Sequence, residues 1–267
     1  MPPAEGGGME INMKKFSDKL FICFSAKDRY VIAQPIVYHL KNYGINVWYD
    51  RYEMIMGDDR FKKNIEEGAG KSKYAIIILS HNTITSFCAR EEIQTLKLRY
   101  FKGEVTVFPV LYELKPSDIP PVFAWIKKLI FKEADRSTGT LEICNHIVCK
   151  ITCDMLNNCK YKNINEIIQS KLPLPRSIRH LFENYIRVDN SNLNSKITLL
   201  YAIYIIITES NDPALRQICK VPCKIFDRLF TENLLNLLID YRELWLLENS
   251  ICILIECYYG SCTEFKI

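Results

Sequence analysis

The chain has 267 residues, of which 48% are hydrophobic, so it can bury the core of one large domain or of two modest ones. Its 35 basic and 31 acidic residues are interspersed and leave a net charge of only +4, without the long runs of one sign that follow a phosphate backbone. Nucleic acid is therefore not the expected partner.

The cysteines and the N-terminal segment both bear on the compartment. The 11 cysteines are an odd number in apolar surroundings, which indicates reduced thiols and a cytoplasmic protein. Residues 1–17 lack the apolar stretch of a secretory signal, and their proline and glycine content predicts a flexible leader. The longest apolar stretch, 197–208, is well short of the roughly 20 residues that cross a bilayer. We therefore expect no membrane span.

From Lys19 onward, short apolar runs rich in β-branched residues alternate with amphipathic segments, which is typical of βα units on a parallel sheet. The run IIIL at 76–79 indicates a central strand, because a strand covered on both faces is apolar throughout. The fold class is therefore α/β, with a flavodoxin-like five-stranded parallel sheet. Its strands are predicted at residues 19–25, 45–50, 74–80, 104–112 and 129–134, and the helices between them within 28–44 and over 60–71 and 86–101.

The alternation of predicted strands and helices ends after the fifth strand. A closing helix is predicted over 138–156, and from Asn157 onward apolar helical stretches are separated by polar turns without any strand pattern. We expect a leader over 1–17, an α/β domain over 18–156 and an all-helical domain over 157–267. The strongest helices of that last domain are predicted at 192–208 and 222–259.

Four sequence blocks of the α/β domain are informative because of their order and spacing. They are KLFICFSAKD from Lys19, NYGINVWYDRYEMIMGDD from Asn42, KSKYAIIILSHNTITSFCAREEIQTL from Lys71, and VFPVLYE from Val107 with the following PSDIPP. In order and spacing these blocks resemble the TIR (Toll/interleukin-1 receptor) domain family. The resemblance covers about half of the chain, implies the TIR fold, and says nothing of residues 157–267.

The resemblance also implies an activity. Enzymatic TIR domains cleave NAD⁺ at the nicotinamide–ribose bond and leave ADP-ribose or a cyclised isomer, with NAD⁺ as substrate and no cofactor. Their catalytic glutamate lies in a W-x-x-x-E pattern, from which this sequence departs. Alignment from Leu79 and Ser80 puts Cys88 at the tryptophan and Glu92 at the glutamate. Alignment on the aromatic residue pairs Phe87 with Glu91 instead. We prefer Glu92, and Glu91 stays the alternative.

Further site residues follow from the topology, because the ligand crevice of an open parallel sheet lies at the carboxyl ends of its strands. Lys27 would offset the diphosphate charge, although Lys27 and Asp28 fit a turn and helix cap equally well, and Trp48 fits core packing. Gly57 would supply a permissive backbone in a loop that gates the pocket and mediates assembly. The substrate-binding candidates are Phe24, Ser25, Lys27, Asp28, Trp48, Asp50, Ser80, Phe87 and Cys88, and the candidates for the assembly loop are Glu53, Gly57 and Asp58.

The chemistry needs a carboxylate and no metal. Breaking the bond between ribose and nicotinamide builds positive charge on the ribose, which a nearby glutamate stabilises. The cysteines at 144, 149, 153 and 159 lack the spacing of a zinc site, so no metal is expected.

Two functions compete. The first is an NAD⁺ nucleosidase or cyclase in innate immune or cell-death signalling, activated by self-association of the TIR domain, and the retained Glu92 favours it. The second is a non-catalytic TIR adaptor that signals by TIR–TIR contact, which the missing tryptophan favours. By analogy, the helical domain would sense a protein or ligand trigger or promote assembly.

Overall fold

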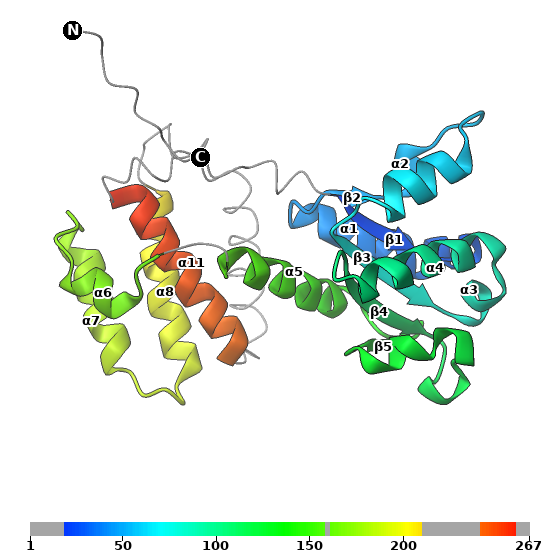
Figure 1. The fold of residues 1–267 in the computed structure, drawn as a ribbon. Coiled ribbons are helices and arrows are strands. Elements are labelled where there is room, and N and C mark those ends of the chain that lie inside the picture. The colour runs from blue at the N-terminus through cyan, green and yellow to red at the C-terminus, as the bar shows by residue number, and fades with distance from the viewer. Residues whose placement is uncertain (1–18, 158–160, 210–240, 260–267) are drawn as a thin grey trace, which may run out of the picture. The chain divides into compact units, whose positions relative to one another are not determined.

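The computed structural model describes residues 19–157, 161–209 and 241–259 (Figure 1). The chain divides into two compact units, one within residues 14–148 and the other mainly within 149–267. That division falls inside helix α5 (Thr140–Leu156), which the sequence assigns whole to the first domain, so the limits 18–156 and 157–267 stay a prediction. The expected leader and residues 222–240 of the last expected helix lie outside the described residues.

The first unit is built on a parallel five-stranded sheet, as predicted (Figure 1). The strand order is β2-β1-β3-β4-β5, the flavodoxin-like order, and all six residues of β3 are buried at its centre. The edge strand β2 is shorter than predicted, because the chain turns into a helix at Asp50. The strands are β1 (Leu20–Cys23), β2 (Val47–Trp48), β3 (Tyr74–Leu79), β4 (Thr106–Tyr112) and β5 (Lys132–Ala134).

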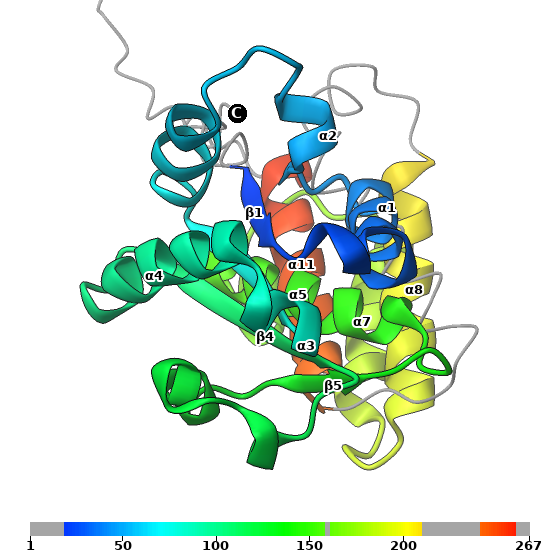
Figure 2. The same cartoon turned by 90° about the vertical axis from the view of Figure 1, so that its right-hand side faces the viewer.

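Helices cover both faces of this sheet (Figure 2). Helix α4 (Phe87–Phe101) packs Ile93 and Leu96 on one face, while α1 (Gln34–Asn42) and α5 lie on the other, where the Cys144 thiol approaches the Ile36 carbonyl. The remaining helical segments of this unit are Ala26–Asp28, Arg29–Ala33, α2 (Asp50–Glu53), Phe61–Ala69, α3 (His81–Thr85), Pro116–Asp118 and Pro121–Lys128.

Gly68 lets the helical segment Phe61–Ala69 approach the sheet closely. The rings of Phe21 on β1 and Trp48 on β2 lie 5.2 Å apart, directly beneath it. A Cβ atom on Gly68 would lie 2.8 Å from the Phe21 ring and 3.1 Å from the Trp48 ring. The absent side chain therefore fixes how near this segment lies to β1 and β2.

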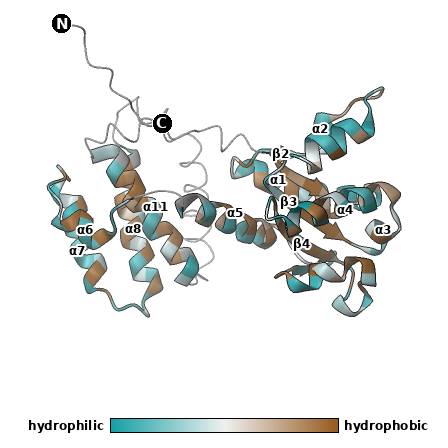
Figure 3. Cartoon of the chain, in the orientation of Figure 1, coloured by the Kyte–Doolittle hydropathy of each residue, from teal (hydrophilic) through white to brown (hydrophobic). Residues whose placement is uncertain are grey.

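The second unit contains only helices among its described residues, as predicted. Helix α8 begins and ends within one residue of the predicted range 192–208. Hydrophobic residues are concentrated in the strands of the first unit and along the inner sides of these helices (Figure 3). Within the described parts of the chain, no helix is both long and apolar enough to cross a membrane. The helices are α6 (Ile164–Gln169), α7 (Arg176–Arg187), α8 (Leu193–Thr208) and α11 (Tyr241–Tyr259).

Candidate active site

Glu92 lies almost completely buried on the face of α4 that packs against the sheet. Only 6% of the residue is exposed. The Asn64 amide donates a hydrogen bond to its Oε1 atom, and the thiol of Cys23, the last residue of β1, is also a hydrogen-bond partner. The apolar side chains of Ile93 and Leu96 draw this face of α4 inward and carry Glu92 with it. The preferred catalytic glutamate therefore lies at the carboxyl end of β1.

Burial determines the acidity of Glu92. Loss of solvation raises its pKa from an ordinary 4.5 to about 7, while hydrogen bonds from Cys23 and Asn64 act in the opposite direction. The negative charge of Asp50 raises the pKa further, and the positive charge of Arg60 lowers it. At neutral pH this side chain is therefore divided between its protonated and ionised forms.

Glu91, the alternative, has a different environment. Its Oε2 atom accepts a hydrogen bond from Arg60 Nη2 at 2.5 Å, and both side chains are about one-third exposed. Glu91 also lines a hollow of roughly 520 Å³ beside α4, whereas Glu92 does not. The apolar side chains lining this hollow are Phe61, Ile65, Phe87, Ile93, Val122, Phe123 and Trp125.

An aromatic and charged group lies at the carboxyl ends of β1 and β2. The rings of Phe24 and Tyr49 stack with centroids 5.8 Å apart, and the Arg29 guanidinium lies 5.0 Å from the Phe24 ring centroid. Arg29 also binds both carboxylate oxygens of Asp50, at 2.5 and 2.7 Å, which raises its pKa. Two predicted site residues, Phe24 and Asp50, are thus joined by an arginine that the sequence did not single out.

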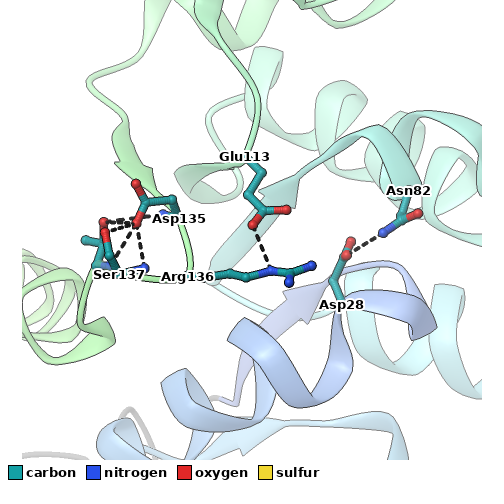
Figure 4. Close-up of polar contacts among 7 residues, drawn as sticks. Asp28, Asn82, Glu113, Asp135, Arg136 and Ser137 are labelled. Carbon is teal, nitrogen blue, oxygen red and sulfur yellow. Dashed lines mark hydrogen bonds and ion pairs between the residues drawn. The ribbon is translucent and has the colours of Figure 1, made fainter.

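Asp28 joins the ends of two strands instead of capping a helix. It is 2% exposed, and its two oxygens accept hydrogen bonds from the Ser80 hydroxyl at 2.5 Å and from the Asn82 amide at 2.7 Å (Figure 4). Ser25, not Asp28, caps the short helix after β1 by accepting from the Lys27 amide at 3.4 Å. The bond between Asp28 and Ser80 bridges β1 and β3.

A further polar group follows β4 and β5 at the same edge (Figure 4). Arg136 Nε lies 3.1 Å from the carboxylate of Glu113, a residue in a left-handed conformation with φ +47°. Arg136 also hydrogen-bonds to Tyr112, whose pKa is raised mainly by burial. Four hydrogen bonds from Ser137 and Thr138 lower the pKa of Asp135 to about 2. The guanidinium of Arg136 extends towards Asp28 in this view.

The remaining predicted residues fall into three places. Lys27 is exposed, and Trp48 is 5% exposed in the core, where it packs against Phe21. Phe87 and Cys88 are exposed in the first turn of α4. In the loop region after β2, Glu53 pairs with Lys19, Gly57 has φ +101°, and Asp58 accepts a hydrogen bond from the Ile55 amide at 2.9 Å.

The sequence analysis did not identify several residues that surround Glu92 and Asp50. Cys23 lies inside the predicted strand 19–25, and Asn64 is a polar residue on the buried side of a predicted helix, so the signal in the sequence was weak for either. Arg29 follows the first quoted block and Tyr49 lies within the second, but their contact across β1 and β2 needs the folded sheet. The full set comprises Cys23, Arg29, Tyr49, Arg60 and Asn64.

Comparison with known proteins agrees with this geometry. Residues 20–141 match the model of the family described as TIR domain. A 2′ cyclic ADP-D-ribose synthase from Acinetobacter baumannii is 28% identical over 100 residues, which are 38% of this chain and 37% of that protein. An NAD(+) hydrolase from a Theionarchaea archaeon is 26% identical over 104 residues, covering 39% and 31%. An NAD(+) hydrolase from Escherichia coli is 27% identical over 100 residues, covering 37% and 32%. The chain thus spans about a third of the length of these relatives.

Proposed function

Because residues 20–141 belong to the TIR domain family, we propose that this chain cleaves the bond between nicotinamide and ribose in NAD⁺. The observation that carries the proposal is Glu92, a buried glutamate with a pKa raised to about 7 at the carboxyl end of β1. Relatives named as NAD(+) hydrolases and cyclic ADP-ribose synthases support the choice of substrate. The product is linear or cyclised ADP-ribose, and NAD⁺ is the substrate without a further cofactor.

Glu92 is the group that would act on the ribose. The nicotinamide of NAD⁺ carries a positive charge, which favours the ionised form of a neighbouring carboxyl group. As the bond breaks, the positive charge moves from the departing ring to the ribose, and a buried carboxylate stabilises this charge strongly because little water screens it. The departing nicotinamide is neutral, so it needs no proton from the protein.

The other groups at the sheet edge would bind the rest of the dinucleotide. The partly exposed ring of Phe24, stacked on the buried ring of Tyr49, would offer a flat surface to the dinucleotide, and exposed Lys27 would meet the diphosphate. Since Glu92 is 6% exposed, substrate entry requires movement of the neighbouring loop, residues 54–59. In that loop Ile55 is 80% exposed, and Gly57 holds the left-handed conformation that side chains disfavour.

The test is to incubate the purified, concentrated full chain with NAD⁺ and to follow nicotinamide release by chromatography. Glu92→Gln keeps the shape of the side chain but removes its charge, so release should fall by about two to three orders of magnitude. Glu67→Gln, which removes an exposed carboxylate from the segment 61–69, is the matched control and should retain release. NADH, whose ring is neutral, should be a poor substrate for all variants.

A loss that follows Glu91→Gln instead would move the catalytic role to Glu91. No release at all, even when the chain is fused to an oligomer, would favour the adaptor. The exposed apolar residues Ile55 and Met56 support that second function, because a loop tip of this kind suits contact between TIR domains.

Regulation is part of the same proposal. Self-association of TIR domains through the loop after β2 would bring subunits together, and the helical region would respond to a protein or ligand trigger in innate immune or cell-death signalling. Within that region an open hollow of roughly 600 Å³ is lined by Tyr161, Lys162, Glu166 and Glu256. Glu256 is 5% exposed and pairs with Lys162 at 3.2 Å, which gives this hollow a charged wall for a small polar ligand.

A further inference from the structure

We propose that Glu91 and Arg60 form a positioning pair that sets the charge of Glu92, with Glu91 competing against Glu92 for the Arg60 guanidinium. The proposal rests on Glu92 as the reacting carboxylate. It gives Glu91, the other glutamate that aligns with the family pattern, a role that is not catalytic.

The geometry places one guanidinium beside two adjacent glutamates of α4. Arg60 Nη2 binds Glu91 at 2.5 Å, at the half-exposed side of the helix. The same guanidinium interacts electrostatically with buried Glu92 and favours its ionised form. Asn64 follows Arg60 by four residues and donates to Glu92, so Arg60 lies on the side of its own segment that faces both glutamates.

The second terminal nitrogen of Arg60 is available for that exchange. Nη1 is buried and has no hydrogen-bond acceptor among the described residues. A buried donor without an acceptor costs about 1–3 kcal/mol, more when the group is charged. An arrangement in which Nη1 donates to an ionised Glu92 would remove this cost. Arg60 therefore has two competing arrangements, one bound to Glu91 and one bound to Glu92.

Arg60 also lies where movement of the loop would reach it. It follows the loop 54–59 directly and precedes the segment Phe61–Ala69, whose Asn64 donates to Glu92. Any ligand or neighbouring subunit that displaces the loop would therefore act on Arg60 and Asn64 together. The ion pair to Glu91 holds this end of the loop on α4.

The charge of Glu92 depends on groups from every element packed against it. Cys23 from β1 and Asn64 from the segment 61–69 are hydrogen-bond partners, Asp50 from α2 adds negative charge, and Arg60 adds positive charge. Glu91 binds Arg60 directly and is, among the described residues, the acidic side chain that forms an ion pair with it. Removing Glu91 or Arg60 should therefore change the titration of Glu92 in opposite directions.

The experiment is a carboxyl titration of the full chain, with glutamate carboxyl carbons labelled with ¹³C and the Glu92 signal assigned by its loss in Glu92→Gln. In Glu91→Gln the freed guanidinium favours ionised Glu92, so the titration midpoint should fall by about one pH unit. In Arg60→Gln the midpoint should rise by a similar amount. Glu67→Gln changes the net charge as Glu91→Gln does, but Glu67 pairs with Lys63, at 3.2 Å, and not with Arg60. The titration midpoint of Glu92 should therefore stay in place in this variant.

Opposite shifts establish the pair if Glu91→Gln no longer shifts the midpoint in an Arg60→Gln background, because a direct effect of the Glu91 charge on Glu92 would persist there. Shifts of the same sign, or no shift in either variant, would overturn it. The pH profile of kcat/KM for NAD⁺ cleavage should move with the carboxyl midpoint. If opposite shifts occur in a chain without any NAD⁺ cleavage, the pair stands and the proposed function fails. If cleavage occurs without the shifts, the reverse is true.

Discussion

Two carboxyl groups are buried at the same edge of the sheet, and their surroundings differ. Asp28 is 2% exposed, and its two oxygens accept hydrogen bonds from Ser80 and Asn82, which join the ends of β1 and β3. Glu92 is 6% exposed and accepts one amide bond, from Asn64, while the weak thiol donor of Cys23 is shared with the Ala89 carbonyl, 3.6 Å from its sulfur. Each oxygen of Asp28 accepts a hydrogen bond from a hydroxyl or an amide, whereas Glu92 has one amide donor and a thiol.

The difference separates a carboxyl group that stabilises the fold from one that is available for chemistry. Burial of a carboxyl group is unfavourable, and the hydrogen bonds to both oxygens of Asp28 offset part of that cost. At Glu92 the penalty remains as a raised pKa of about 7, and the positive charge of the proposed substrate, NAD⁺, would favour its ionised form. Burial alone therefore does not distinguish the two roles, and the donors around each group do.

Removal of the Asp28 carboxyl group should have the largest effect on stability. Asp28→Ala leaves the Ser80 hydroxyl and the Asn82 amide without their acceptor, and we expect a loss of about 3 kcal/mol in the free energy of unfolding. Urea unfolding followed by tryptophan fluorescence measures it, with exposed Glu67→Ala as a control that should change stability by less than about 0.5 kcal/mol. A loss no larger than that of the control would mean that Asp28 is not structural.

Glu92→Gln should increase the free energy of unfolding at alkaline pH, in contrast to Asp28→Ala. The unfolded chain releases the Glu92 proton near pH 4.5, whereas the folded chain keeps it until about pH 7. The folded state therefore binds more protons in this interval, and the wild type loses stability as pH rises through it. Since the glutamine has no proton to lose, the variant should gain up to about 3 kcal/mol over the wild type between pH 4.5 and pH 8. A pH-independent difference in urea unfolding would contradict the raised pKa.

Asn64→Ala should have the smallest effect, on acidity more than on stability. Without its amide donor the ionised form of Glu92 is less favourable, so its pKa should rise further, and the acid limb of NAD⁺ cleavage should move by about one pH unit to higher pH. Asn82→Ala removes an amide from Asp28 instead and should leave the position of that limb unchanged. A shift in both variants would erase the distinction between the two carboxyl groups.

Most of the sheet could be predicted from the sequence because its signals are local. The apolar run of β3 and the spacing of Ile93 and Leu96 on α4 follow from burial on two faces and on one face. The carboxyl end of β2 was predicted too late, because Tyr49 suits a strand, whereas the structure starts helix α2 at Asp50.

The site was only partly predictable, because its residues meet across the sheet. Glu92 and Asp28 were named from the family blocks, but the donors that distinguish them come from other elements, as Asn64 does from the segment 61–69. Trp48 fitted two predictions, and the structure shows it packed beneath Gly68 in the core. Its contact with substrate stays a prediction, as do the roles of the other site residues.

Gly68 has a consequence for the acidity of a side chain that it does not touch. It lies four residues after Asn64, on the same buried side of the segment Phe61–Ala69, and it rests directly on the rings of Phe21 and Trp48. The absence of one methyl group thus sets how close the Asn64 amide comes to Glu92. In this fold the proton affinity of Glu92 depends on the steric fit of Gly68, an uncharged residue on the neighbouring helical segment.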